Sequence, residues 1–499
     1  MNPLKKLAGE TVLYGASSII GRFLNYLLFP LHTLVFPTGS YGIITELYVY
    51  AAFLNIIYLY GMETSFFRFA TKNKASGDAI YNTAFTSVSL TSLVFSSALC
   101  LAATPLVNSM GYFGKEHFVY MFAGILAIDA ILAIPFAKLR MDGKAKTFAK
   151  AKFTSIFINI GINVFFLYFC FHIDAGKIFP SLQPLVNKIY NPSFNLEYVF
   201  GANLVSNALL LPYLWKYLFK IKLKINMAWL SGMFRFGYPI LFTGLALVTN
   251  EMLSRWAIKY WLPTGFYPGF SNQDILGIFG GVFKLAILMN LGIQAFRYAA
   301  EPFFFSKADE KGSPLLFARV MDWFVIFGGL IFLAVSLNLD ILQFLLRNPD
   351  YRTAIHIVPI LLLASLFMGI NYNLSAWYKL VDFTKAGTLI TFIGAFITIV
   401  ANFILVPLWG YTGSALAGVL AYFLMSVTSY MWSRNINPIP YQLKNIFFYI
   451  SLAILLYVIS AIMPDLKFWI AKIFHLLLVL VYLAAVYLKE RKFITSAIH

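Results

Sequence analysis

Residues 277–305 read GIFGGVFKLAILMNLGIQAFRYAAEPFFF, and this run indicates the class of protein more clearly than any other. It is longer than the ~20 apolar residues that an α-helix needs to cross the hydrocarbon core of a bilayer. Lys284, Arg297 and Glu301 interrupt it. A cation near the bilayer centre costs roughly 3 kcal/mol on insertion scales and is seldom placed there without a use. The run therefore predicts a membrane-spanning helix whose charges serve a purpose.

The composition extends this prediction to the whole chain. Of its 499 residues, 60% are hydrophobic and only 12% are charged. A soluble domain of this composition would expose large apolar patches, so we expect an integral membrane protein. No cleavable signal peptide is expected. Cys100 and Cys170 lie inside apolar runs without metal-ligand spacing, so we interpret them as small core residues.

Apolar runs of spanning length follow one another along almost the entire chain. We expect about fourteen membrane-spanning helices in an all-α polytopic protein. The predicted spans are 9–34, 41–70, 77–108, 116–138, 150–172, 196–219, 228–250, 275–305, 316–339, 354–378, 386–407, 411–433, 445–463 and 467–488.

The net charge of +18 is explained by orientation rather than by nucleic acid. With the N-terminus inside, most Lys and Arg residues of the connecting segments fall on the inner side, as the positive-inside rule requires. We therefore expect both termini in the cytoplasm and the loops 173–195 and 251–274 on the outer side.

A weak similarity between two parts of the sequence indicates an internal repeat. Residues 41–43 read YGI and are followed by Glu63, while residues 276–278 read LGI and are followed by Glu301. Parallel repeats of this kind place a substrate site around a central cavity between the two halves. The predicted organisation is a six-helix lobe over 1–225, a second over 226–436, and two additional helices with a short cytoplasmic tail over 437–499.

Motifs from the seventh predicted helix onward carry a family resemblance. They are FGYPI (236–240), NEMLSR (250–255), KYWLP (259–263), the run 277–305, NLSAWYKLVDFTKAG (373–387) and NFILVPLWGYTGSA (402–415). They resemble the corresponding parts of bacterial polysaccharide flippases, of the O-antigen type, in the multidrug/oligosaccharidyl-lipid/polysaccharide exporter superfamily. One departure concerns Arg255: the family often has Asp directly before this arginine, whereas this chain has Ser254, and Glu251 lies one turn earlier, where it can pair with Arg255.

The resemblance implies a function. The expected substrate is a polyprenyl-pyrophosphate-linked oligosaccharide, flipped by alternating access from the cytoplasmic to the outer leaflet of the bacterial inner membrane for surface polysaccharide and lipopolysaccharide synthesis. Polysaccharide polymerase and export machinery are the expected partners, beside membrane lipids. We expect a monomer with no cofactor, no metal site and no nucleic acid. Without a nucleotide-binding loop, coupling to H⁺ or Na⁺ or exchange of substrate is expected to drive transport.

The candidate substrate-binding residues are the embedded cations Arg22, Lys284 and Arg297, together with Arg255 of the predicted outer loop 251–274. The planar guanidinium of Arg22 suits bidentate contacts with phosphate, although a structural pair with Glu46 or Glu63 is the alternative. Lys284 and Arg297 lie about 140° apart around an ideal helix, so one small site is not expected to hold both. For Arg297 we favour an i,i+4 pair with Glu301.

The embedded acids allow two interpretations. Buried carboxylates are the usual proton or sodium sites of transporters, and they also neutralise embedded cations such as Arg22, Arg235 and Lys284. We favour charge balancing over ion coupling because no close pair of acids occurs at ligand spacing. The candidate residues are Glu46, Glu63, Asp129, Glu301 and Asp322.

Helix breakers mark one candidate hinge. Gly237 and Pro239 lie near the start of the seventh predicted span. Proline inside a helix removes a backbone hydrogen bond and permits a kink, which could open one face of a transporter. The alternative is that membrane helices simply tolerate these residues.

Two other functions compete with a flippase. A cation-coupled multidrug antiporter of the same superfamily should have an acidic cavity, and Arg22 and Lys284 argue against it. A membrane enzyme, such as a glycan polymerase, needs catalytic groups in a sizeable outer loop. The loop 173–195 offers only Asp174, so we expect no enzymatic activity.

Overall fold

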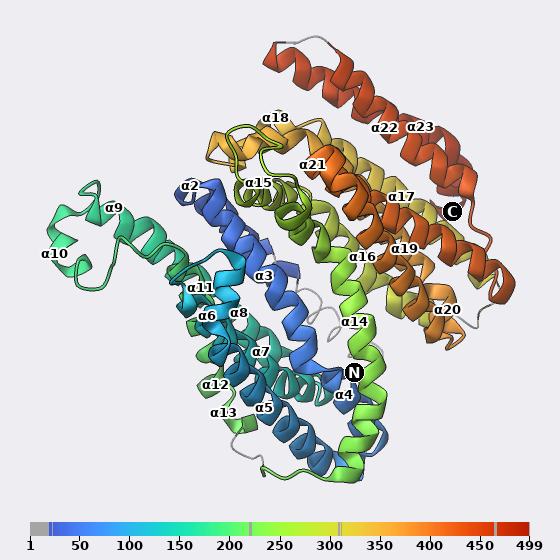
Figure 1. The fold of residues 1–499 in the computed structure, drawn as a ribbon. Helices are drawn as coiled ribbons and strands as arrows, with labels where there is room; N and C mark the ends of the chain where they lie inside the picture. The colour runs from blue at the N-terminus through green and yellow to red at the C-terminus, as the bar shows by residue number, and fades with distance from the viewer. Residues whose placement is uncertain are drawn as a thin grey trace. The chain divides into compact units, whose positions relative to one another are not determined.

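The computed structural model describes residues 19–21, 23–218, 222–307, 310, 312–463 and 467–498, with side chains to residue 491. The described residues are helical apart from turns and short connections (Figure 1). Among the described residues, ten helices are long and apolar enough to cross a membrane, or eleven if one bent pair counts as a span. The prediction of a multi-pass all-α protein is therefore confirmed, while the count of fourteen stays a prediction.

The chain divides into two compact units with a boundary between Met252 and Leu253. This boundary lies inside α14 (Met227–Trp261), so α14 contributes to both units. The division into two six-helix lobes and a C-terminal pair stays a prediction. The other helices of the N-terminal unit are α2 (Phe29–Val35), α3 (Thr38–Leu59), α4 (Met62–Lys72), α5 (Gly77–Leu101), α6 (Ala103–Met110), α7 (Glu116–Met141), α8 (Ala145–Val164), α9 (Phe171–Asp174), α10 (Gln183–Val186), α11 (Leu196–Ala208), α12 (Leu210–Tyr213) and α13 (Trp215–Leu218).

The C-terminal unit contains longer helices. Its α21 is bent where the backbone at Gly410 leaves the helical region, between the predicted spans 386–407 and 411–433. The remaining helices of this unit are α15 (Asn272–Leu285), α16 (Ile287–Ser306), α17 (Ser313–Ser336), α18 (Leu339–Leu342), α19 (Val358–Leu374), α20 (Ala376–Leu380), α21 (Thr384–Ile436), α22 (Leu443–Ile462) and α23 (Phe468–Ile498).

Two predicted spans are interrupted. The span 41–70 breaks between α3 and α4, where Tyr60 and Gly61 both adopt left-handed conformations with φ of 34° and 75°. The span 275–305 breaks at Ala286, and the axes of α15 and α16 differ by 50°. Because each break ends one helix and starts another, it leaves backbone groups without their usual helical partners. Such interruptions inside a membrane are tolerated where protein or a polar cavity surrounds them.

One predicted loop is wrong in extent. Residues 251–261 continue α14 instead of belonging to an outer loop 251–274. The helix persists because no Gly or Pro occurs between Glu251 and Trp261, and it stops just before Pro263. Arg255 therefore lies on a helix.

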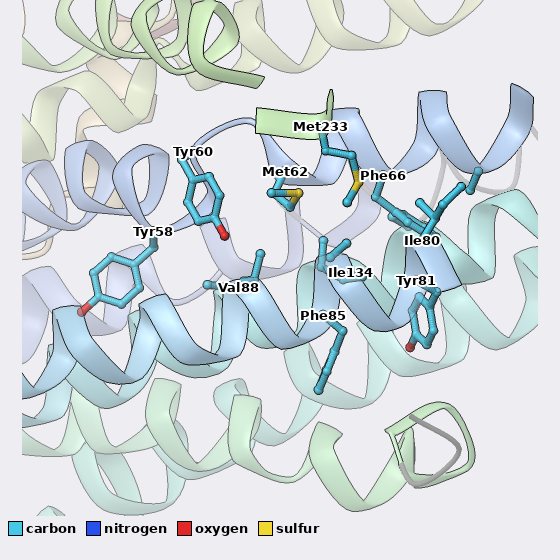
Figure 2. Packing of buried hydrophobic residues seen from close by; sticks show 14 of the residues in the cluster. Tyr58, Tyr60, Met62, Phe66, Ile80, Tyr81, Phe85, Val88, Ile134 and Met233 are labelled. Carbon is cyan, nitrogen blue, oxygen red and sulfur yellow. The ribbon is translucent and has the colours of Figure 1, made fainter. Parts of the chain in front are cut away.

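The core of the N-terminal unit surrounds the break between α3 and α4 (Figure 2). Tyr58 in the last turn of α3 and Tyr60 directly after this helix both bond to α5: the Tyr58 hydroxyl lies 3.0 Å from Ser96 Oγ, and the Tyr60 hydroxyl lies 2.8 Å from Ser87 Oγ. Both phenols are thereby satisfied inside an apolar environment. Figure 2 shows α4, α5, α7 and α14 contributing the rest of the cluster, with Met62, Phe66, Ile80, Ile134 and Met233.

Candidate functional site

The N-terminal unit contains a cavity of about 320 Å³ between α3, α4, α7, α8 and α11, which we call the charged cavity. Two acids and two bases line it, together with polar side chains. Charged side chains at the depth of membrane-spanning helices are costly unless they are paired or hydrated, so a polar cavity is where they are expected. The charged residues of its wall are Glu63, Asp129, Arg140 and Lys152.

Glu63 and Arg140 form an ion pair across the charged cavity. Glu63 stands in the first turn of α4, because the break at Gly61 starts a new helix there, and Arg140 stands in the last turn of α7. The helix dipole stabilises an acidic side chain at the N-terminus of a helix and a basic side chain at the C-terminus. The break in the backbone therefore creates a suitable position for one partner of the pair.

Asp129 lies in the middle of α7 and is accessible from the charged cavity. It accepts a hydrogen bond of 2.8 Å from Nδ2 of Asn207 on α11. The ammonium group of Lys152 on α8 lies 4.4 Å from the centre of the Phe136 ring, and its charge acts on Asp129 and Glu63. The cavity thus combines a carboxylate, an amide and a cation from three helices.

Arg140 also lines a second cavity, of about 500 Å³, at the ends of α4, α5 and α7. Its wall carries Lys74, Asp78, Lys138 and Asp142. Arg140 therefore borders both cavities, whereas its partner Glu63 borders only the charged cavity.

The C-terminal unit brings together two of the predicted substrate-binding cations. Lys284 stands in the last turn of α15, just before the break at Ala286, and Arg255 stands on α14. The guanidinium of Arg255 lies 4.2 Å from the centre of the Phe283 ring, and its positive charge acts on Lys284. The C-terminal end of α15 favours a cation at Lys284 through the helix dipole. An anion bound beside these two neighbouring cations would reduce the repulsion between them.

Arg297 lies in a different place. It lines a small cavity of about 20 Å³ with Tyr372, and its guanidinium lies 5.3 Å from the centre of the Tyr372 ring. Glu301 forms its ion pair with Lys379 on α20, at 2.5 Å, instead of the predicted i,i+4 pair with Arg297. The angle predicted between Lys284 and Arg297 assumed one straight helix, which the bend at Ala286 rules out.

The remaining acids occupy structural contacts. Glu46 is buried and accepts a hydrogen bond from the Tyr112 hydroxyl. Asp322 is buried on α17, 3.6 Å from Arg319. Arg319 also pairs with Glu490 on α23 at 3.0 Å, which ties α23 to α17. Arg22, the predicted phosphate-binding residue of the first span, lies outside the described residues.

Gly237 is a point of close backbone approach. A Cβ atom on Gly237 would lie 2.9 Å from both the Ser65 Oγ and the Tyr60 carbonyl oxygen, at the break between α3 and α4. Ser65 Oγ also donates a hydrogen bond of 2.9 Å to the Met233 carbonyl oxygen on α14. Pro239 continues α14 without ending it. The predicted hinge therefore packs against an actual interruption in a neighbouring helix.

Comparison with known proteins shows which fold the chain has. No family model matches the chain, and no curated protein sequence matches it. Solved structures do match over nearly the whole length. The lipid II flippase MurJ in an inward closed conformation matches with a TM-score of 0.70 at 14% identity, covering 96% of this chain and 99% of that chain. The chain has the fold of these transporters.

Multidrug transporters share this fold. An outward-facing MATE-family multidrug resistance transporter of the MOP superfamily matches with a TM-score of 0.58 at 15% identity, covering 87% of this chain and 98% of that chain. A MOP-superfamily transporter from Pyrococcus furiosus, reported with a binding pocket of reverse polarity, matches with a TM-score of 0.57 at 14% identity, covering 87% of this chain and 98% of that chain.

Four residues that interact with the candidate acids are not among the candidates from the sequence: Arg140, Lys152, Asn207 and Lys379. In the sequence, Arg140, Lys152 and Lys379 are basic residues of the predicted inner segments. Their signal was present but weak: Lys152 and Asn207 lie within or at the edge of predicted spans 150–172 and 196–219. A polar residue inside a predicted span, like Lys284, is expected to have a polar or charged partner on a neighbouring helix.

The ion pair of the charged cavity gives a first testable expectation. Replacing Arg140 by Ala should lower the free energy of unfolding by about 1–2 kcal/mol, because a charge-assisted hydrogen bond is lost at a half-exposed position. Adding Glu63→Gln should cost less in the Arg140→Ala background than alone, since the partner is already gone. Thermal or denaturant unfolding in detergent measures both effects.

A matched control exists on the same turn of α7. Lys138 pairs with Asp142 at 3.2 Å in an i,i+4 arrangement. Lys138→Ala should cost about 0.5 kcal/mol or less. Equal losses for the Arg140 and Lys138 variants, or additive effects of Glu63→Gln and Arg140→Ala, would show that the cavity pair does not form.

Proposed function

We propose that the chain is a flippase that moves a polyprenyl-pyrophosphate-linked oligosaccharide from the cytoplasmic to the outer leaflet of a bacterial inner membrane. The observation that carries this proposal is the pair of neighbouring cations, Lys284 and Arg255, at the break in a membrane-spanning helix. A diphosphate is the part of such a lipid that needs cations when it leaves water. The fold of transporters supplies the alternating-access framework.

The lengths of the matched chains support a lipid flippase over a multidrug antiporter. The flippase MurJ covers 96% of this chain, whereas the MATE-family structure covers 87%. The MATE-family structure therefore leaves a larger part of this chain unmatched than MurJ does. A transporter of long lipid tails has use for additional helices that a transporter of small drugs does not require.

Coupling to an ion is part of the proposal. Asp129 is the candidate for binding H⁺ or Na⁺, because it is a carboxylate open to a polar cavity in the N-terminal unit. Its cavity partners Asn207 and Lys152 come from other helices, so a change in its charge would act on three helices together. Arg22, Arg297 and Arg255 complete the candidate substrate contacts, and the polymerase and export machinery of the same polysaccharide are the proposed partners.

A cation-coupled multidrug antiporter is the second candidate. Asp129 and Glu63 in the charged cavity favour it, because a cationic drug needs acidic groups. Arg140 and Lys152 stand beside these acids, so the cavity wall carries as many bases as acids. The resulting balance of charge weakens the case for a cationic drug.

A reconstituted assay separates the two candidates. Purified protein in liposomes is given a fluorescent polyprenyl-pyrophosphate disaccharide in one leaflet, and the sugar exposed on the other leaflet is measured with a lectin. Protein-dependent appearance of the sugar supports the flippase. Ion-driven uptake of a cationic dye without movement of the lipid-linked sugar would support the antiporter and reject the flippase.

A further inference from the structure

The segment 175–195, between α9 and α11, has two apolar sides. It contains a 3₁₀ turn, Pro180–Leu182, and the short helix α10 (Gln183–Val186). In Figure 1 it projects from the end of the helix formed by α8 and α9, in green at the left. Each apolar side of such a connection has to be covered by protein or by lipid. An ordinary loop in water has at most one apolar side, which packs on the protein.

The inner side is packed against the helices of its own unit. Val186 and Tyr190 are buried with Cys170 and Ile173 at the end of the α8–α9 span. The Tyr190 ring stacks on the Tyr198 ring with centroids 5.5 Å apart and an angle of 13°. These contacts give the segment a defined position.

Hydrogen bonds fix the same position. Gln183 Nε2 donates to the Asp174 carbonyl oxygen at 2.8 Å, and the Asn191 amide donates to the Tyr198 hydroxyl at 2.7 Å. The middle of the segment is therefore tied to the helix that precedes it, and its C-terminal part is tied to the helix that follows it. Its outer side consequently faces one direction.

The outer side is apolar and exposed. Phe179 and Leu185 are 62% and 60% exposed, and Leu182 and Ile189 are exposed as well. The spacing of Leu182, Leu185 and Ile189 places these three residues along one side of the helical turns around α10, and Phe179 lies directly before these turns. Phe179 is held with φ of 39°, a conformation that residues with a Cβ rarely adopt. The backbone thus presents a large aromatic ring outward at a conformational cost.

This apolar side continues a surface that faces lipid. The span Ala145–Asp174 ends directly before the segment, and its last turns expose Phe165, Tyr168, Phe169 and Phe171. Aromatic rings of this kind gather where membrane-spanning helices reach the headgroups. From about residue 153, where the basic residues stop, to Asp174 the helix is about as long as the ~30 Å hydrocarbon core is thick.

We propose that the segment 175–195 lies on the membrane as an interfacial element, with Phe179, Leu182, Leu185 and Ile189 inserted at the boundary of headgroups and acyl chains. The exposed Lys177 and Lys188 contact the lipid phosphates beside this apolar side. The segment anchors the end of the α8–α9 span at a fixed depth. This role is independent of the transported substrate.

Depth-dependent fluorescence quenching tests the proposal on the full chain in vesicles. A single reactive cysteine is introduced at Leu185, at Ile189 or at Asn187, and labelled with an environment-sensitive fluorophore. Cys100 is replaced by Ala, while Cys170 is fully buried and stays. The vesicles contain phosphatidylethanolamine and phosphatidylglycerol, with or without phospholipids that carry a nitroxide high on the acyl chain.

Asn187, which directly follows α10, is the matched control because it is exposed and polar and lies about 200° around the helical path from Leu185. Quenching at positions 185 and 189 should exceed that at 187 by about twofold or more, since an interfacial apolar face lies some 5–10 Å below the headgroups. Equal quenching at the three positions would overturn the proposal. A blue-shifted emission at 185 and 189 without lipid quenching would also overturn it, by showing that protein covers this side.

Discussion

Replacing Lys284 by Gln should reduce flipping of a polyprenyl-pyrophosphate-linked sugar by about tenfold or more, because a charge-assisted contact to phosphate contributes roughly 1.5–3 kcal/mol. Lys284 and Arg255 are neighbouring cations, so removing one charge also removes mutual repulsion. The folded protein should therefore be at least as stable as before, while transport falls. A loss of activity together with a gain or no change in stability distinguishes an anion site from a structural contact.

Two further variants sharpen this expectation. Lys284→Arg keeps the charge and should retain part of the activity. Lys307→Gln removes a surface lysine that pairs with Glu310 at 2.7 Å, and it should leave flipping unchanged. Initial flipping rates in liposomes and unfolding midpoints in detergent are measured for all three proteins. Full activity of Lys284→Gln would show that the cation pair does not hold the diphosphate.

Much of the fold follows from hydrophobic length alone. The predicted span 116–138 corresponds to α7 (Glu116–Met141), and 445–463 corresponds to α22 (Leu443–Ile462). A membrane-spanning helix satisfies its backbone within itself, so its position depends on the local sequence. This is why spans could be predicted even though no contact between them was known.

The interruptions could not be predicted in the same way. Ala286 separates α15 from α16 although alanine is a strong helix former. Such a break is decided by the surroundings of the helix, which the local sequence does not contain. In the predicted span 41–70, Gly61 is a residue that permits an interruption of the helix. Whether the helix breaks there depends on the residue that packs against Gly61, which lies far along the chain.

Charge partners were missed for a related reason. Glu63 pairs with Arg140 and Glu301 pairs with Lys379, and in both cases the base belongs to a stretch that hydropathy assigns to a loop. Basic residues near the ends of spans satisfy the positive-inside rule, so a second role leaves no mark in the composition. The partner of an embedded acid becomes visible only when the helices are packed.

The partner of Gly61 is Gly237, and the approach of their two backbones gives the second large expected effect. Gly61 has φ of 75°, and a Cβ atom there would lie 2.9 Å from the Cα and the carbonyl carbon of Gly237. Gly61→Ala therefore combines an unfavourable backbone conformation with a clash against another backbone. We expect a loss of about 2–4 kcal/mol in the free energy of unfolding.

The two causes can be separated by single substitutions. Gly111 has φ of 83° with nothing within 4 Å of a Cβ atom, so Gly111→Ala tests the conformation alone and should cost about 1 kcal/mol. Gly237→Ala tests the close contact alone, because Gly237 has ordinary helical geometry within α14, and it should cost about 1–3 kcal/mol. Unfolding in detergent should place Gly61→Ala as the most destabilised of the three.

The same variants test whether Gly237 acts as a hinge. If α14 must move against the break between α3 and α4 during transport, Gly237→Ala should slow flipping more than its loss of stability accounts for, because the added methyl group meets Ser65 and Tyr60. Gly111→Ala should leave flipping unchanged. Proportional losses of stability and activity in Gly237→Ala would assign this glycine to packing alone.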